Sequence, residues 1–224
     1  MLRVEFHAHT IYSKDCLVSP EQLVKVCHRK SIDRVVITDH NTIEGARAAQ
    51  KLDSELVVIG EEIMTTQGEI LAAYVKDEIP AGLSPRETVR LLKEQGSFIS
   101  ISHPFDVARS GHWQLDDLLE ILPDVDAIEV YNSRCWLPGF NRQAKKFADR
   151  MNLPGTVGSD AHSLLELGRA VLLLEGFEGP DGMRKVIRDG KSLVKWSPPW
   201  FHLFSRYAVI KKRLNPNLDM KKQP

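Results

Sequence analysis

Short apolar runs recur along the chain, and segments with helical periodicity lie between most of them. We expect these runs to form strands, and they cover residues 2–6, 35–37, 56–59, 69–75, 98–102, 125–130, 156–158 and 170–174. The run at 69–75 follows a turn at Gln67-Gly68, so it is expected to pair antiparallel with the run before it. Regular alternation of strands and helices predicts an α/β fold with a mainly parallel sheet, either doubly wound or closed into a barrel.

Two of the expected helices are marked by their first residues. Ser19-Pro20 and Ser84-Pro85 each place a capping serine before a proline in the first helical turn, where proline is well tolerated. Further helices are predicted over residues 42–49, 115–122, 141–151 and 182–188. Residues 104–114 show little periodicity and form a longer connection than most, so they are a candidate active-site loop.

The C-terminal end of the chain differs from the rest. Beyond residues 197–200 the alternation of strands and helices stops, and an aromatic stretch at 200–204 precedes a basic run at 211–213. We therefore expect a barrel domain over residues 1–196. Residues 197–224 are expected to form an aromatic and basic extension, packed near its start and frayed at its terminus.

Residues of metal-ligating types follow several of the apolar runs. His7 and His9 close the first run, and side chains two residues apart in a strand point to the same side, so both imidazoles can face one point. Apolar runs also end in potential ligands at His40, Glu62, His103, Asp160 and His162. A barrel brings many strand ends around one mouth, whereas a doubly wound sheet brings only a few together. The pattern therefore predicts a closed or nearly closed barrel of about seven strand-helix units.

Composition bears on the class of partner and on the compartment. The chain has 224 residues, and its 30 lysines and arginines balance 30 aspartates and glutamates, so nothing favours binding to a membrane or to long nucleic acid. An anionic ligand must therefore be bound by residues at one site and not by the net charge of the whole chain. The three cysteines lack Cys-x-x-Cys spacing, which favours a reducing compartment. Without a signal-peptide core or a membrane span, we expect a cytoplasmic protein, and we leave its oligomeric state open.

Five motifs, in this order, resemble those of the PHP (polymerase and histidinol phosphatase) superfamily. They are His7-Ala8-His9-Thr10 with Ser13 and Asp15, Ile37-Thr38-Asp39-His40-Asn41-Thr42, Gly60-Glu61-Glu62-Ile63, Ser102-His103-Pro104 and Gly158-Ser159-Asp160-Ala161-His162. The resemblance runs from residue 2 to residue 174. It implies a distorted (β/α)7 TIM-like barrel, a metal site at the C-terminal ends of the strands, and hydrolysis of phosphate esters.

The resemblance also implies two or three divalent ions of zinc, manganese or iron, together with their ligands. One ion would be held by His7, His9, Glu62 and Asp160. Glu62 would bridge to a second ion, which His103 would also hold, and a third would be held by Asp15, His40 and His162. Family members with three filled sites often have another histidine near residues 128–132, where this chain offers only Asn132 as a substitute.

Such a centre has a defined chemistry. A carboxylate that bridges two ions holds them roughly 3.5 to 4 Å apart, and a water shared between them loses its proton near neutral pH. The hydroxide attacks phosphorus while the ions neutralise the phosphate oxygens. We accordingly predict catalytic roles for Glu62, Asp160 and His103, and we expect Asp39 to orient an imidazole.

Several polar residues in loops are candidates for contact with a phosphorylated substrate. Lys14, Asn132 and Arg134 are the predicted substrate residues, and Arg109 and Arg142 are further basic residues in or near loops. Three other histidines are expected to lie outside the site, namely His28, His112 and His202.

The function we favour is a metal-dependent phosphoesterase. One alternative is an amidohydrolase-like C–N hydrolase, which commonly bridges its metals with a carboxylated lysine, whereas no lysine ends a strand here. Another is a non-catalytic metal-binding module of the kind fused to polymerases. A nucleotide or short oligonucleotide phosphate, a histidinol phosphate and another metabolite phosphate all remain possible substrates, and the modest length of the chain favours small nucleotides.

Overall fold

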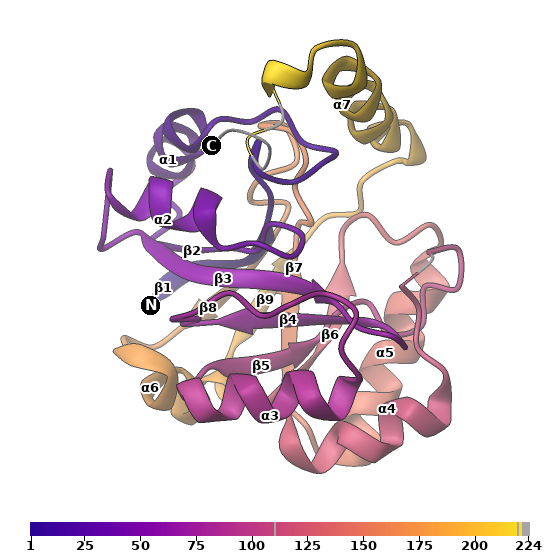
Figure 1. Ribbon diagram of the computed structural model, residues 1–224. Coiled ribbons are helices and arrows are strands. Elements are labelled where there is room, and N and C mark those ends of the chain that lie inside the picture. Colours follow the sequence, from indigo (N-terminus) through magenta and orange to yellow (C-terminus); the bar gives the residue numbers. More distant parts are fainter. Residues whose placement is uncertain (110, 219, 221–224) are drawn as a thin grey trace.

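A computed structural model describes residues 1–109, 111–218 and 220, and its centre is one nine-stranded sheet. The strands are β1 (Leu2–Ala8), β2 (Arg34–Ile37), β3 (Val57–Met64), β4 (Glu69–Ala73), β5 (Phe98–Ile101), β6 (Ala127–Asn132), β7 (Gly155–Gly158), β8 (Ala170–Leu174) and β9 (Lys191–Val194). The longer helices are α1 (Pro20–Arg29), α2 (Glu44–Gln50), α3 (Pro85–Gln95), α4 (Leu115–Ile121), α5 (Pro138–Met151), α6 (Gly179–Val186) and α7 (His202–Leu214). Figure 1 shows the strands crossing the middle of the molecule with helices around them.

The sheet curls until its two halves nearly meet, which produces the predicted barrel. The strand order is β7-β6-β5-β4-β3-β2-β1-β8-β9, so β1 and β7 are far apart within the ladder. Their C-terminal ends nevertheless touch, because the amide of His9 donates to the carbonyl of Ala161 at 3.0 Å and the amide of Ala161 donates to the carbonyl of His7 at 3.2 Å. The strand ends that carry chemistry therefore surround one mouth, and the expected distorted α/β barrel is confirmed.

Local sequence explains where the helices begin and which sides they bury. The Ser19 hydroxyl accepts the amide of Gln22 at the start of α1, and the Ser84 hydroxyl accepts the amide of Glu87 at the start of α3, each before a proline. Apolar side chains then fix the helices to the sheet. Leu23 of α1 packs in a buried cluster with strand β2, and Leu92 of α3 packs in another with strand β5.

The strand pairing agrees with the expectation for β4 and adds a strand at the C-terminal side. β4 pairs antiparallel with both β3 and β5. β9 is an additional strand that pairs antiparallel with β8, within a segment where no strand was expected. Its four residues are all exposed, so its apolar pattern is weak, and the prediction that β8 is the last strand was wrong.

The predicted C-terminal extension is also more ordered than expected. Residues 202–214 form helix α7, although part of the predicted frayed terminus lies outside the described residues. In Figure 1 this helix stands apart from α3, α4 and α6, at the opposite side of the sheet. Its placement matters for the site, because it lies near the C-terminal strand ends. Among the helices that the structure describes, none has the length and apolarity of a membrane-spanning segment.

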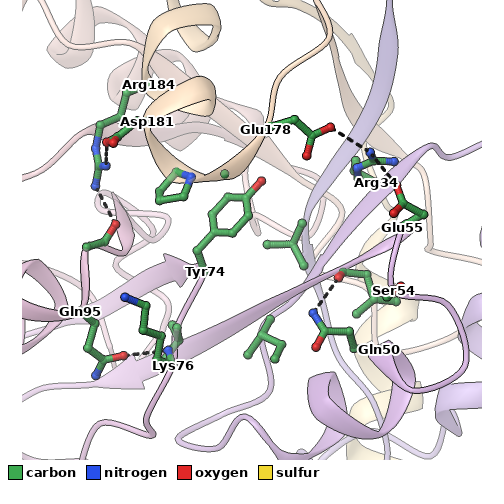
Figure 2. A pocket seen from close by; sticks show the side chains of 17 residues that line it. Arg34, Gln50, Ser54, Glu55, Tyr74, Lys76, Gln95, Glu178, Asp181 and Arg184 are labelled. Atoms are coloured by element: carbon green, nitrogen blue, oxygen red, sulfur yellow. Dashed lines mark hydrogen bonds and ion pairs between the residues drawn. The ribbon is translucent and has the colours of Figure 1, made fainter.

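A cavity of about 590 Å³ lies at the other end of the barrel, where the parallel strands begin (Figure 2). Arg34, the first residue of β2, and Tyr74, just after β4, contribute to its wall, and burial raises the pKa of Tyr74 to about 12. Several of its charged side chains already have partners, as with Arg184, whose guanidinium lies 2.7 Å from Asp181. The cavity contains none of the predicted metal ligands.

Close packing of β3 against its neighbours gives a test of the fold. A Cβ at Gly60 would lie 2.5 Å from Val36 Cγ1 and 2.6 Å from the carbonyl oxygen of Ala72, whereas a Cβ at Gly176 would meet nothing within 4 Å. Gly60→Ala should therefore lower the free energy of unfolding by about 1 to 3 kcal/mol, as overpacking does. Gly176→Ala should change it by less than about 0.5 kcal/mol. Urea denaturation of both variants measures the difference, and equal stabilities would contradict the packing described for β3.

Candidate metal centre

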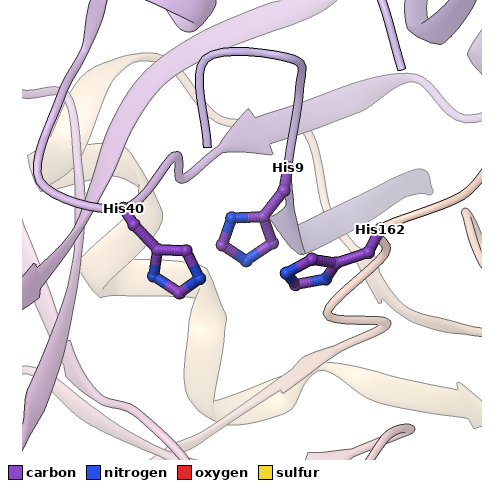
Figure 3. A group of neighbouring side chains, drawn as sticks. All are labelled: His9, His40 and His162. Carbon is purple, nitrogen blue, oxygen red and sulfur yellow. The ribbon is translucent and has the colours of Figure 1, made fainter. Parts of the chain in front are cut away.

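The eight predicted metal ligands gather at the C-terminal mouth of the barrel. β1 carries His7 and leads directly to His9, β3 carries Glu62, and the other ligands follow strands or lie in the loop after β1. That second group comprises Asp15, His40, His103, Asp160 and His162. Figure 3 shows His9, His40 and His162 converging from three separate segments. The ring centroid of His9 lies 4.2 Å from that of His162 and 4.5 Å from that of His40.

Glu62 lies at the centre of this cluster. Its Oε2 atom is 3.0 Å from His40 Nδ1, 3.3 Å from His7 Nε2 and 3.4 Å from His9 Nε2. Its Oε1 atom is 3.2 Å from His103 Nε2. One carboxylate therefore faces imidazoles on both of its oxygens, which is the arrangement that a bridging ligand needs.

The neighbouring residue on β3 faces elsewhere. Glu61 is fully buried, and its Oε2 accepts the amide of Ile79 at 3.0 Å. The two glutamates point to opposite sides of the strand, because side chains alternate along extended backbone.

Asp160 and Asp15 complete the cluster on the side of β7. Asp160 Oδ1 lies 3.3 Å from His162 Nδ1 and 3.4 Å from His9 Nε2, and Asp15 Oδ2 lies 3.2 Å from His162 Nε2. The backbone of Asp160 adopts φ +51°, a left-handed conformation that is strained for an aspartate. Strain of this kind is typical of functional sites, where the surrounding structure holds a residue in place.

Glu69 is a potential ligand that the sequence did not suggest. Its Oε2 lies 3.4 Å from His103 Nε2, and its Oε1 lies 3.9 Å from His40 Nδ1. It belongs to a group with His40 and Glu62 whose ligand atoms all lie within 4.8 Å of one another. The sequence prediction considered only residues at strand C-termini. β4 runs antiparallel, so its first residue, not its last, reaches the mouth.

The oxygen and nitrogen atoms of this cluster are arranged in a way that suits a bound cation. Among the described residues, Glu62 Oε2, Asp160 Oδ1 and Asp15 Oδ1 are buried oxygens that accept no well-formed hydrogen bond. Leaving a buried carboxylate oxygen without a donor is costly, and a metal ion removes that cost. His9, His40 and His162 form one ligand group within 4.8 Å, and His7, His9 and Glu62 form another. Imidazole with carboxylate suits zinc, manganese and iron.

Burial and neighbouring charges shift the pKa values of the clustered histidines in opposite directions. Burial lowers the pKa of His7, but the combined effect of Glu62, Asp160 and Glu129 outweighs it, so the pKa lies well above its usual value. Burial likewise opposes the charge of His40, yet Asp15 and Glu62 hold its pKa well above the usual range. Burial and the two neighbouring histidines keep the pKa of His9 well below its usual value.

Hydrogen bonds behind the ligands fix their orientation. His7 Nδ1 lies 2.9 Å from Glu129 Oε1, and His9 Nδ1 lies 3.0 Å from the Ser13 hydroxyl. That hydroxyl donates to Asp39 Oδ1 at 2.6 Å, so Asp39 reaches an imidazole through Ser13, not directly. Glu129 had not been predicted, because it lies inside β6 and not at its end. Such partners fix the tautomer and the angle of a ligating histidine.

The substrate candidates fall into different environments. Lys14 is exposed and lines the mouth, whereas Arg134 is buried, with its Nε 3.3 Å from Glu166 Oε1. Asn132 donates from Nδ2 to Asp160 Oδ2 at 3.3 Å, and its Oδ1 accepts the amide of Arg134 at 2.8 Å. The oxygen that could replace a histidine ligand is thus already bonded to the backbone.

The remaining basic candidates and the other histidines lie in different parts of the structure. Arg109 reaches into the cluster and donates to Asp160 Oδ2 at 2.6 Å, whereas Arg142 lines a different groove beside α4 and α5. His28 pairs with Asp53 at the surface, and His112 contacts the carbonyl of Arg109. His202 packs on Trp136, with ring centroids 4.4 Å apart, and both residues line the mouth.

The mouth itself is a pocket of about 280 Å³ that opens onto the ligand cluster. Asp15, His40 and His162 lie on its inner side. Four cations line it as well, namely Lys14, Arg109, Arg134 and Arg206. Cations around a buried ligand cluster produce a positive entrance that attracts an anionic ligand.

Comparison with known proteins gives the family and related folds. The family model described as PHP domain matches residues 5–102, and the model described as PHP-associated matches residues 138–192. A relative from Methanocaldococcus jannaschii, the uncharacterized protein MJ1587, is 38% identical over 146 residues, which make up 59% of this chain and 82% of that protein.

Two solved structures share the fold at low sequence identity. One is a two-domain protein of Bacteroides vulgatus containing a predicted PHP-like metal-dependent phosphoesterase, with a TM-score of 0.68 and 20% identity over 86% of this chain and 64% of that one. The other is the lesion-specific endonuclease PfuEndoQ from Pyrococcus furiosus, with a TM-score of 0.64 and 16% identity over 88% of this chain and 59% of that one. The family models and the relative, together with the barrel, place this chain in the PHP domain family.

Proposed function

We propose that this protein is a metal-dependent hydrolase of phosphate esters that acts on small nucleotide or metabolite phosphates. The observation that carries the proposal is the position of Glu62, whose two carboxylate oxygens face His40, His7 and His9 on one side and His103 on the other. A carboxylate placed in this way can be shared by two cations. The cation-lined mouth in front of it suits a phosphate ester.

The ligand groups define which residues would hold the ions. His7, His9, Glu62 and Asp160 would hold one, Glu62 with His103 and Glu69 a second, and Asp15, His40 and His162 a third. Bound divalent ions supply an activated hydroxide near neutral pH and neutralise charge on the phosphate. The chain itself positions these ions through Glu62, Asp160 and His103, and Glu129 and Ser13 hold His7 and His9 at fixed angles.

Two other functions are distinguishable by their chemistry. An amidohydrolase-like enzyme would hydrolyse C–N bonds, but the shared ligand here is a glutamate, and the lysine at the mouth, Lys14, is exposed. A non-catalytic metal module would bind ions without turnover. The proposed function is tested by incubating metal-reconstituted protein with a panel of phosphomonoesters, phosphodiesters and amides. Hydrolysis of amides alone, or of nothing, would contradict it.

The first prediction from the proposed function concerns metal content. Protein reconstituted with zinc or manganese should retain at least two equivalents of metal after gel filtration, measured by elemental analysis. Removing the metal should lower the melting temperature, because an ion that binds only the folded state stabilises it by mass action. The apolar clusters that hold helices to the sheet contain no metal ligand, so the metal-free chain should remain folded by circular dichroism. Melting that does not respond to proven metal loss would contradict a centre built into the fold.

The second prediction compares the activity of variants at the two neighbouring glutamates of β3. Glu62→Gln removes the charge shared between the two sides of the cluster, so phosphatase activity should fall about a hundredfold or more, the scale of losing one preorganised electrostatic element. Glu61→Gln is the matched control, because Glu61 faces away from the histidines and a glutamine oxygen can still accept the amide of Ile79. The control should stay within a few-fold of the wild type. A damaging Glu61→Gln beside a silent Glu62→Gln would show that the ligand assignment on this strand is wrong.

A further inference from the structure

Helix α7 buries few of its own side chains. Of its thirteen residues only Ala208 and Lys212 are buried, while Leu203, Tyr207 and Ile210 are more than half exposed. Helices of soluble proteins usually gain most of their stability from a buried apolar face. Several contacts of α7 are polar, and these lead to the segments that carry the predicted metal ligands.

Lys212 connects α7 to the loop that carries Asp15. Its Nζ donates to the carbonyl of Ser13 at 2.6 Å and also to the carbonyl of Ile11. The ammonium group is buried, which is unusual for lysine and tolerable here because backbone oxygens satisfy it. The same loop supplies Ser13 to His9, so α7 and two ligands of the centre share one short segment.

A second set of contacts joins the start of α7 to the segment that follows β6. The Arg134 guanidinium donates to the Ser205 hydroxyl at 2.6 Å and to His202 Nδ1 at 3.2 Å, and His202 Nε2 lies 3.1 Å from the carbonyl of Arg134. Because Nδ1 of His202 accepts a hydrogen bond from the Arg134 guanidinium, the imidazole must be neutral. Burial, assisted by Arg134, lowers the pKa of His202 to about 4, which keeps it neutral at physiological pH. His202 also stacks on Trp136 with an interplanar angle of 2°.

The cations at the mouth differ in whether they have acidic partners. Arg109 pairs with Asp160 at 2.6 Å, and Arg134 lies 3.3 Å from Glu166. Lys14 and Arg206 line the same pocket, but neither has a carboxylate partner among the described residues. The first two cations therefore belong to the structure of the site, whereas the other two remain available for a ligand.

We propose that α7 is one wall of the substrate pocket, and that its Arg206, together with Lys14, binds the anionic group of a small phosphate monoester. This inference rests on the proposed function, because it names the substrate class of the same site. A pocket of about 280 Å³ is at the lower end of the range for small-molecule sites. Polymeric nucleic acid requires a groove that follows several nucleotides. With α7 at one side, the pocket suits a terminal phosphate whose organic part lies against Trp136, which is 41% exposed.

The test compares two exposed basic positions of α7 in the full-length, metal-loaded protein, with p-nitrophenyl phosphate as the substrate. Arg206→Gln should raise KM about tenfold and leave kcat within a few-fold, because it removes one charge-assisted contact made by bound substrate. Lys211→Gln is the control, since Lys211 is exposed, does not line the pocket and lies over the ring of Tyr207. It should change neither constant. Equal KM values for the two variants would overturn the inference.

A double variant tests whether Lys212 acts by positioning Arg206. Lys212→Met should raise KM about as much as Arg206→Gln, and the double variant should be no worse than either single variant, because both remove the same contact. Additive effects would show that Lys212 does not position Arg206. Melting temperatures of all variants identify any general loss of folding, and Arg206→Gln, at an exposed residue, remains informative if Lys212→Met does not fold.

Two further measurements separate this inference from the proposed function. Calorimetric titration with inorganic phosphate should show affinity about tenfold weaker for Arg206→Gln than for the wild type, whether or not any ester is hydrolysed. Wild-type protein that binds no phosphate, or binds it equally well in both forms, would overturn the inference. Internal cleavage of a long single-stranded DNA as fast as p-nitrophenyl phosphate would also overturn it, although it would leave a phosphoesterase in place.

Discussion

The structure around the mouth depends on keeping the carboxylate of Glu62 buried and charged. Burial alone raises the pKa of this group, but His7 and His40 hold it well below its usual value. A buried carboxylate is stable only when opposite charge or hydrogen-bond donors surround it. The imidazoles provide part of this, and the oxygens that lack a well-formed hydrogen bond are positions where a cation could provide the rest. The strand ends, the partners behind the histidines and the left-handed backbone at Asp160 together place the predicted ligands around this one group.

Much of this arrangement was predictable from the sequence, because most of the predicted ligands lie where apolar runs end, whereas Asp15 was implied only by the family resemblance. In parallel strands the run itself forms the barrel, and the next residue reaches the mouth, so position along the chain reports position in space. Glu69 was not predicted as a ligand, because β4 runs antiparallel and its first residue lies at the mouth. The contact between Glu129 and His7 was not predicted, because the two residues are 122 positions apart and no local sequence pattern indicates such a contact.

Helix α7 was not predictable for a different physical reason. Sequence patterns reveal helices through one apolar face that packs on a core, and the apolar residues of α7 are mostly exposed. Its links to loops that are distant in sequence include hydrogen bonds that Lys212 and His202 donate to backbone carbonyls and one that Ser205 accepts from Arg134. The basic run that looked like the start of a frayed tail in the sequence is therefore partly a structural anchor, since Lys212 is buried while Lys211 and Arg213 are exposed.

These contacts give the metal centre and the pocket wall a common support. The loop after β1 contains Asp15, orients His9 through Ser13, and accepts both hydrogen bonds of Lys212. A displacement of α7 would therefore disturb the backbone at Ser13, which lies two residues from Asp15. A shift of this loop would in turn move the carbonyls of Ser13 and Ile11, and with them Lys212 and the helix. Since these bonds join α7 directly to the loop, the coupling requires no long path through the protein. Binding of a phosphate at α7 and retention of metal at the centre should accordingly favour one another.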